Sequence, residues 1–153
     1  MIRPNDMTDI SLAGNAENVV VFVDDDPTLR GLVASTLKLR GISVVTAADG
    51  DEGLAVMKVL SPKVVLLDVR MPGGLSGPEV CRKMREELAL TETFVIFLTT
   101  QDACDIRADA QAAGADVYMC KPFDPDTLVH MIERLLSAGR DEVGEEHLLQ
   151  SQP

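Results

Sequence analysis

The sequence predicts an α/β fold, a single doubly wound (βα)5 sandwich of three layers around a parallel five-stranded sheet. Three observations predict it. Five short apolar runs alternate with stretches of helical periodicity along the chain. Several of these runs are almost continuously apolar, which is typical of parallel strands covered on both faces. Strand–helix units in succession also favour right-handed crossovers within one sheet.

The five predicted strands are short and rich in Val, Ile, Leu and Phe. They lie at 19–23, 42–45, 64–67, 94–98 and 117–120. The first, third and fourth are apolar almost throughout, so we expect them to be buried on both faces. We interpret the second as an edge strand.

The first two predicted helices have clear end signals. The first has Asp26 as its N-cap, Pro27 at its first position and Gly41 at its end. The second covers 54–60 with helically spaced apolar residues, and Pro62 stops it.

The remaining three helices follow from the apolar spacing. The third is centred on 80–88, and the fourth covers 106–113 and ends at Gly114. The apolar face of the fourth helix is built on Ile106 and several alanines and buries little apolar area. We therefore expect this helix to change position at a low cost in free energy. The fifth covers 128–136 and opens at Asp124 and Pro125.

The length and composition fit one globular domain. We expect a domain at 18–139, a flexible N-terminal tail at 1–17 and an acidic C-terminal tail at 140–153. No apolar run approaches the roughly 20 residues of a membrane helix, and the N-terminus does not read as a signal peptide. A cytoplasmic location is therefore the expectation.

The net charge and the numbers of cysteine and histidine residues argue against several kinds of function. The formal net charge is −11, which disfavours direct binding to a phosphate backbone. Three cysteines without CxxC spacing argue against a disulfide framework or a zinc site, and two histidines are too few for a histidine-based site.

Polar residues gather where the predicted strands end. Asp24 and Asp25 follow the first strand, Asp68 the third, Thr99 the fourth and Lys121 the fifth. Parallel strands deliver such residues to one rim of the sheet, where ligands bind in folds of this class. Each residue alone is more often structural than functional, but their coincidence at one rim favours function.

This set of side chains suits phosphoryl transfer. Crowded carboxylates repel one another, and a hard divalent cation such as Mg²⁺ relieves the repulsion. A carboxylate beside the metal can attack phosphorus. Lys121 and the Thr99 hydroxyl can stabilise oxygens of the transferred group.

These residues resemble the receiver domain of two-component response regulators, including the chemotaxis-regulator-like ones. Four segments carry the resemblance, which runs from about 18 to 138: VVVFVDDDP at 19–27, VVLLDVRMP at 64–72, FLTT at 97–100 and GADVYMCKPF at 114–123. The resemblance implies a flavodoxin-like sheet of order 2-1-3-4-5.

The resemblance also implies a role for each site residue. Asp68 would be the phosphoacceptor. Asp25, Asp68 and the backbone carbonyl of Arg70 would bind Mg²⁺ directly, and Asp24 mainly through water. Lys121 would pair with the phosphoryl group and precede a cis peptide bond at Pro122.

Signalling would follow a population shift between two conformations. Thr99 would be the switch hydroxyl that moves toward the phosphoryl group, and Tyr118 would turn inward with it. The chain would not be an enzyme beyond its own phosphorylation and dephosphorylation.

The expected partners follow from the same resemblance. The donor would be a histidine kinase or a histidine phosphotransfer protein, and the recipient a downstream protein target. We expect no direct nucleic-acid contact and no membrane contact, because the acidic chain shows no output domain after the fifth helix. A monomer or a phosphorylation-dependent dimer, acting as a stand-alone regulator or phosphorelay intermediate, fits these expectations.

Two alternatives stay open. The segment Asp24 to Thr28 also resembles the motif of haloacid-dehalogenase-like phosphatases, in which Asp24 would be the nucleophile and Asp26 the general acid. That family needs a later acidic pair at a strand end, whereas Asp124 and Asp126 follow Pro122 in a pattern typical of a helix start. The second alternative is a receiver-like binding module that is never phosphorylated, which Thr100 keeps open because a small residue is usual there.

Overall fold

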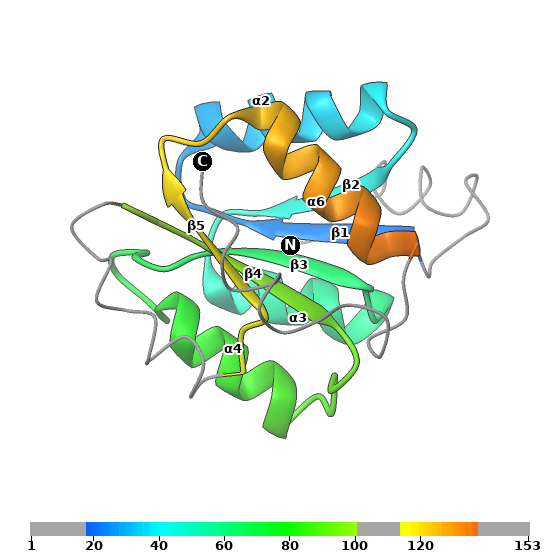
Figure 1. Cartoon of the computed structure of the whole chain (residues 1–153). Helices are drawn as coiled ribbons and strands as arrows, with labels where there is room; N and C mark the ends of the chain where they lie inside the picture. The colour runs from blue at the N-terminus through cyan, green and yellow to red at the C-terminus, as the bar shows by residue number, and fades with distance from the viewer. Residues whose placement is uncertain (1–17, 101–113, 138–153) are drawn as a thin grey trace.

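The computed structural model describes residues 18–100 and 114–137. Its five strands form one parallel sheet in the order β2-β1-β3-β4-β5, as predicted (Figure 1). The strands are β1 (Val19–Val23), β2 (Ser43–Ala47), β3 (Val64–Asp68), β4 (Phe94–Thr100) and β5 (Val117–Lys121). Since β1 and β3 are neighbours in the middle of the sheet, the residues after them meet at one rim.

Helices cover both faces of the sheet and complete the three layers (Figure 1). Helices α2 (Pro27–Leu39) and α6 (Pro125–Ser137) pack on one face. Helices α3 (Gly50–Leu60) and α4 (Gly77–Glu86) pack on the other. The predicted helix at 106–113 and both predicted tails lie outside the described residues.

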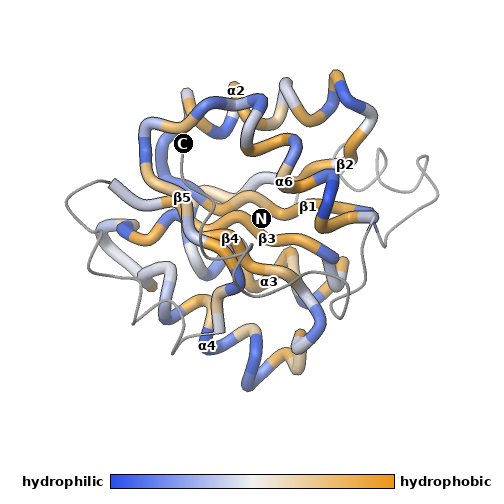
Figure 2. Tube along the Cα trace, viewed as in Figure 1, coloured by the Kyte–Doolittle hydropathy of each residue, from blue (hydrophilic) through white to orange (hydrophobic). Residues whose placement is uncertain are grey.

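The central strands are buried on both faces, which explains their unbroken apolar sequence. In β1, Val21 faces α3 and α4 while Phe22 faces α2 and α6, and both are fully buried. Figure 2 shows the strands as hydrophobic segments inside helices of mixed hydropathy. Complete burial of a side chain such as Phe22 contributes about 1.5 to 3 kcal/mol to stability.

The helix ends confirm the sequence signals for α2. The Asp26 carboxylate accepts hydrogen bonds from the backbone N–H groups of Thr28 at 2.9 Å and Leu29 at 3.4 Å. Gly41, shortly after the helix, has φ of +76°, which glycine adopts without steric cost. The Asp26 carboxylate therefore caps the start of α2 and does not contribute to the group of side chains at the rim of the sheet.

Helix α4 starts with a reciprocal cap. The Glu79 N–H donates to Ser76 Oγ at 3.3 Å, and the Ser76 N–H donates to Glu79 Oε1 at 3.0 Å. These hydrogen bonds lower the pKa of Glu79. The cap fixes where α4 begins after the loop that follows Asp68.

Several boundaries differ from the prediction. Strand β2 starts one residue later and runs to Ala47, and α4 ends at Glu86, before Leu88. Strand β4 continues through Thr99 and Thr100, because they pair in register with Cys120 and Lys121 of β5. Backbone pairing thus continues where the apolar pattern stops.

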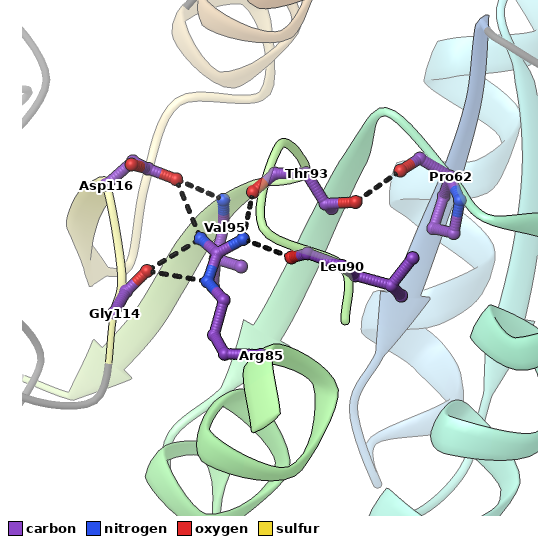
Figure 3. A network of polar contacts seen from close by, with 7 residues as sticks. All are labelled: Pro62, Arg85, Leu90, Thr93, Val95, Gly114 and Asp116. Atoms are coloured by element: carbon purple, nitrogen blue, oxygen red, sulfur yellow. Dashed lines mark hydrogen bonds and ion pairs between the residues drawn. The ribbon is translucent and has the colours of Figure 1, made fainter. Parts of the chain in front are cut away.

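Arg85, near the end of α4, ties that helix to the start of β4 and β5 (Figure 3). Its guanidinium donates to the carbonyl oxygens of Leu90 and Thr93 at 2.6 Å each and of Gly114 at 2.7 Å. It also lies 3.2 Å from the Asp116 carboxylate. This network closes the end of the sheet opposite the rim that carries Asp24 and Asp68.

No helix in the described ranges is both long enough and apolar enough to cross a membrane.

Candidate functional site

Three carboxylates meet at the carboxyl ends of β1 and β3. One carboxylate oxygen from each of Asp24, Asp25 and Asp68 lies within 4.8 Å of the other two. Asp24 and Asp68 are buried, and Asp25 is exposed. The two strands are adjacent and parallel, so their ends bring residues distant in sequence to the same place. The cluster is therefore open to solvent on the side of Asp25.

The ammonium group of Lys121, at the end of β5, bridges two of these carboxylates. Its Nζ donates to Asp24 Oδ2 at 2.9 Å and to Asp68 Oδ1 at 3.2 Å. Burial alone would lower the pKa of Lys121, but the hydrogen bonds and charges of Asp24 and Asp68 raise it above its ordinary value. Lys121 is thus a firmly charged cation between two acids. The Lys121–Pro122 peptide bond is cis, as the resemblance implies.

Asp68 has an altered acidity in this environment. Burial, followed by the negative charge of Asp24, raises the pKa of Asp68 to about 6, although Lys121 acts in the opposite direction. One ammonium therefore does not balance the negative charge of the cluster. A second cation would relieve the remaining repulsion.

The donor set fits a divalent cation with a preference for oxygen. Three carboxylates supply hard oxygen ligands within the span that one ion requires, and the exposed Asp25 leaves room for water ligands. The described residues therefore hold a cluster that could bind a metal ion.

The backbone after Asp68 is held by a close contact with Gly77. The Gly77 N–H donates to the carbonyl oxygen of Val69 at 2.9 Å, and the Val69 N–H donates to that of Leu98 at 3.0 Å. A Cβ atom at Gly77 would lie 2.6 Å from the Asp68 carbonyl oxygen. Only glycine fits this place. Arg70 is exposed on the same stretch.

Thr99 and Tyr118 lie on neighbouring strands. Thr99 is buried, and its hydroxyl donates to the carbonyl oxygen of Thr100 at 3.2 Å. Tyr118 is also buried, and it pairs with Phe97, two residues before Thr99. Tyr118 belongs to the buried apolar cluster on the α3–α4 face of the sheet, and Thr100 is exposed at the strand end.

The geometry weighs against the phosphatase alternative. Asp26, its general acid, has its carboxylate engaged by the first N–H groups of α2. Asp124 stands just before α6, where its carbonyl oxygen accepts the Leu128 N–H at 3.1 Å and its carboxylate accepts the Thr127 hydroxyl at 3.1 Å. Both acids therefore act as helix-start residues.

The sequence interpretation missed two residues that shape this site. Arg30 Nη1 donates to the backbone carbonyl oxygen of Asp24 at 2.6 Å, and Gly77 packs on the backbone of Asp68. For Arg30 the signal was its place in the first turns of the helix after Asp24. For Gly77 it was a glycine a few residues before the third predicted helix.

A family model described as the response regulator receiver domain matches residues 20–133. Among curated proteins, the transcriptional regulatory protein TrcR of Mycobacterium tuberculosis is 38% identical over 117 residues, which are 76% of this chain and 44% of TrcR. The DNA-binding response regulator MtrA of Mycolicibacterium smegmatis is 33% identical over 127 residues, which are 82% of this chain and 54% of MtrA.

Solved structures with a similar fold include a chemotaxis protein and a receiver domain. The chemotaxis response regulator CheY4 of Vibrio cholerae has a TM-score of 0.72 and 34% sequence identity, and the match covers 78% of this chain and 98% of CheY4. The receiver domain of NtrX from Brucella abortus has a TM-score of 0.72 and 29% identity, and the match covers 78% of this chain and 99% of that domain.

The comparisons overturn one expectation. Direct nucleic-acid contact was excluded from the net charge, but MtrA is named as DNA-binding and TrcR as a transcriptional regulatory protein. The chain spans about half the length of the curated relatives that it matches. The charge of the matched half says nothing about contacts made by the other half of those proteins, so the exclusion was wrong.

Proposed function

The chain belongs to the response regulator receiver domain family, the signalling domains of two-component systems, and from this premise we propose that Asp68 accepts a phosphoryl group with Mg²⁺ bound beside it. One observation carries the proposal. The carboxylates of Asp24, Asp25 and Asp68 converge within 4.8 Å, and the Lys121 ammonium bonds to two of them. We take the domain to span residues 18–139.

Each residue has a defined task in the proposed reaction. Asp25, Asp68 and the carbonyl oxygen of Arg70 would hold Mg²⁺, and Asp24 would act mainly through water. The bound ion supplies positive charge where phosphate oxygens approach the carboxylates. An oxygen of Asp68 forms a bond to phosphorus while the bond from phosphorus to the donor breaks, and the leaving group keeps that electron pair. Lys121 neutralises a phosphoryl oxygen, because its ammonium already touches Asp68.

The phosphorylated state then changes one face of the domain. Thr99 is close to the strand end and carries a hydroxyl that can turn toward a phosphoryl oxygen on Asp68. The movement of Thr99 would leave more room beside Tyr118, which is already buried on the neighbouring strand, and would so stabilise its buried position. Phosphorylation therefore favours the inward arrangement of Tyr118.

The output of the signal is proposed from the relatives. MtrA is named as a DNA-binding response regulator, and TrcR as a transcriptional regulatory protein. We propose that the phosphorylation state of Asp68 controls DNA binding by the whole protein in which this domain works.

A phosphodonor assay tests the function directly. The protein is incubated with Mg²⁺ and acetyl phosphate, its intact mass is measured, and the acyl phosphate is trapped and located by peptide mapping. We expect one phosphoryl adduct on Asp68 that disappears in Asp68→Asn. Asp26→Asn is the matched control, because Asn also caps a helix and Asp26 lies beside the site. It should retain the adduct.

The same assay separates the alternatives. An adduct on Asp24 would support the phosphatase reading. No adduct, together with no spectral response to beryllofluoride, would support a binding module that is never phosphorylated.

A further inference from the structure

Arg30 connects helix α2 to the turn that carries the acidic residues. Its Nη1 donates to the backbone carbonyl oxygen of Asp24 at 2.6 Å. Two other contacts hold the same turn: the Asp26 N–H donates to Asp24 Oδ1 at 2.9 Å, and the Asp24 N–H donates to the carbonyl oxygen of Ala47 at 3.1 Å. Of these three contacts, that from Arg30 is the only one made by a cationic side chain.

The carbonyl group that Arg30 binds belongs to the peptide bond between Asp24 and Asp25. Because a peptide unit is planar, the position of its carbonyl oxygen also fixes the direction of the bond to the next Cα atom, which is that of Asp25. The Asp24 carboxylate is buried and bonded to Lys121, whereas Asp25 is exposed. The position of the Asp25 carboxylate therefore depends strongly on this one peptide unit.

We propose that Arg30 is a positioning residue for Mg²⁺: it orients the Asp24–Asp25 peptide so that the Asp25 carboxylate meets that of Asp68. The inference rests on the proposed function, since it concerns the same ion. Arg30 does not touch the ion or the phosphoryl group in this role. It acts through a hydrogen bond from a charged donor, which is stronger than one from a neutral donor.

A purely electrostatic role for Arg30 predicts the opposite result. A guanidinium near a cation site repels the cation, so removal of the charge would tighten Mg²⁺ binding. Removal of a positioning contact weakens binding. The sign of the change in the dissociation constant therefore separates the two accounts.

The chain offers a matched control for the charge. Arg30 and Lys38 line the same hollow of about 320 Å³ between α2 and β2. Lys38 lies about two helical turns beyond Arg30 on the same helix. Lys38→Met removes one positive charge from this hollow and leaves the Asp24 carbonyl contact in place.

The test is a titration of the full chain with Mg²⁺, followed by NMR chemical shifts or calorimetry, with the thermal unfolding midpoint of each variant measured without Mg²⁺. We expect Arg30→Met to raise the dissociation constant about tenfold, as loss of an outer-shell partner of a metal ligand does. Lys38→Met should stay within about twofold of the wild type, and Arg30→Lys should fall between, because its ammonium can donate one hydrogen bond.

Each outcome decides the matter. An unchanged or lower dissociation constant in Arg30→Met would overturn the proposal while the proposed function stands. The absence of Mg²⁺ binding by the wild type would overturn both. If Arg30→Met does not fold, Arg30→Lys carries the test, and a wild-type dissociation constant in a protein with a lowered unfolding midpoint would show a structural role only.

Discussion

Gly77 lies so close to Asp68 that a Cβ atom at position 77 would stand 2.6 Å from the Asp68 carbonyl oxygen and 2.9 Å from the Cα atom of Val69. Both obstructing atoms belong to the backbone, so no side chain can rotate away to make room. The start of α4 and the end of β3 therefore touch directly. The backbone of the proposed phosphoacceptor is held by this contact.

We expect Gly77→Ala to lower the free energy of unfolding by about 1 to 3 kcal/mol, the usual cost of overpacking. The substitution must move either α4 or the backbone of Asp68, so phosphorylation by acetyl phosphate should slow as well. Urea unfolding and the initial rate of adduct formation measure the two effects.

Gly74→Ala is the control, because a Cβ atom there meets nothing within 4 Å in the same loop. It should change stability by less than about 0.5 kcal/mol. Equal effects of the two substitutions would mean that the contact with Asp68 does not matter.

The acidity of Asp68 predicts a dependence of stability on pH in protein without Mg²⁺. Its pKa is about 6 in the fold and 3.8 as the reference for the unfolded chain. The folded state therefore holds a proton that the unfolded state has lost between these values. The stability from this group is complete below about pH 4 and is lost as the pH rises through about 6.

Asp68→Asn removes this loss of stability at rising pH, since the amide does not ionise. Relative to the wild type, the variant should gain about 1 to 2 kcal/mol of stability as the pH rises from about 4 to 7, after allowance for solvent screening. Urea unfolding in the presence of a chelator at several pH values measures the difference. A constant difference across this range would contradict the raised pKa of Asp68.

The sequence predicted the fold because its signals are local. Continuous apolar runs marked the buried strands, and Asp26, Pro27 and Gly41 marked the ends of α2. The convergence of Asp24 with Asp68 followed from topology, because the carboxyl ends of parallel strands share one rim.

The missed contacts depend on how separate segments pack. The bond from Arg30 to the Asp24 carbonyl requires the rotamer of a long side chain, and the fit of Gly77 on Asp68 requires the placement of α4. The extension of β4 through Thr99 depends on pairing with β5, which hydropathy does not record. The charge argument against DNA failed because charge in one part of a protein does not limit the contacts of another part.

The ion pairs of Lys121 predict that the ammonium substitutes in part for a metal ion. Lys121→Met leaves Asp24 and Asp68 buried together without the ammonium group that bonds to both carboxylates. We expect a loss of about 2 to 4 kcal/mol without Mg²⁺. Added Mg²⁺ should stabilise this variant more than the wild type, because the ion neutralises the same carboxylates.

Thermal unfolding with and without Mg²⁺ measures both effects. Lys63→Met is a control, since Lys63 Nζ donates to the carbonyl oxygen of Leu136 rather than to a carboxylate. Its response to Mg²⁺ should equal that of the wild type. A Lys121→Met response no larger than that of Lys63→Met would refute the prediction.

Arg85 predicts a stability effect far from the carboxylate cluster. Its side chain bonds to three carbonyl oxygens and to the Asp116 carboxylate, and it is mostly buried (Figure 3). Arg85→Met leaves these acceptors without that donor, so the free energy of unfolding should fall by about 2 to 4 kcal/mol. Arg82→Met, on the exposed side of the same helix, should change this free energy by less than about 0.5 kcal/mol.

The network of Arg85 lies at the opposite end of the sheet from the carboxylates, so Mg²⁺ binding by the folded Arg85→Met protein should keep its wild-type dissociation constant. A changed dissociation constant would instead mean that α4 and β5 transmit strain along the sheet to Asp68 and Lys121.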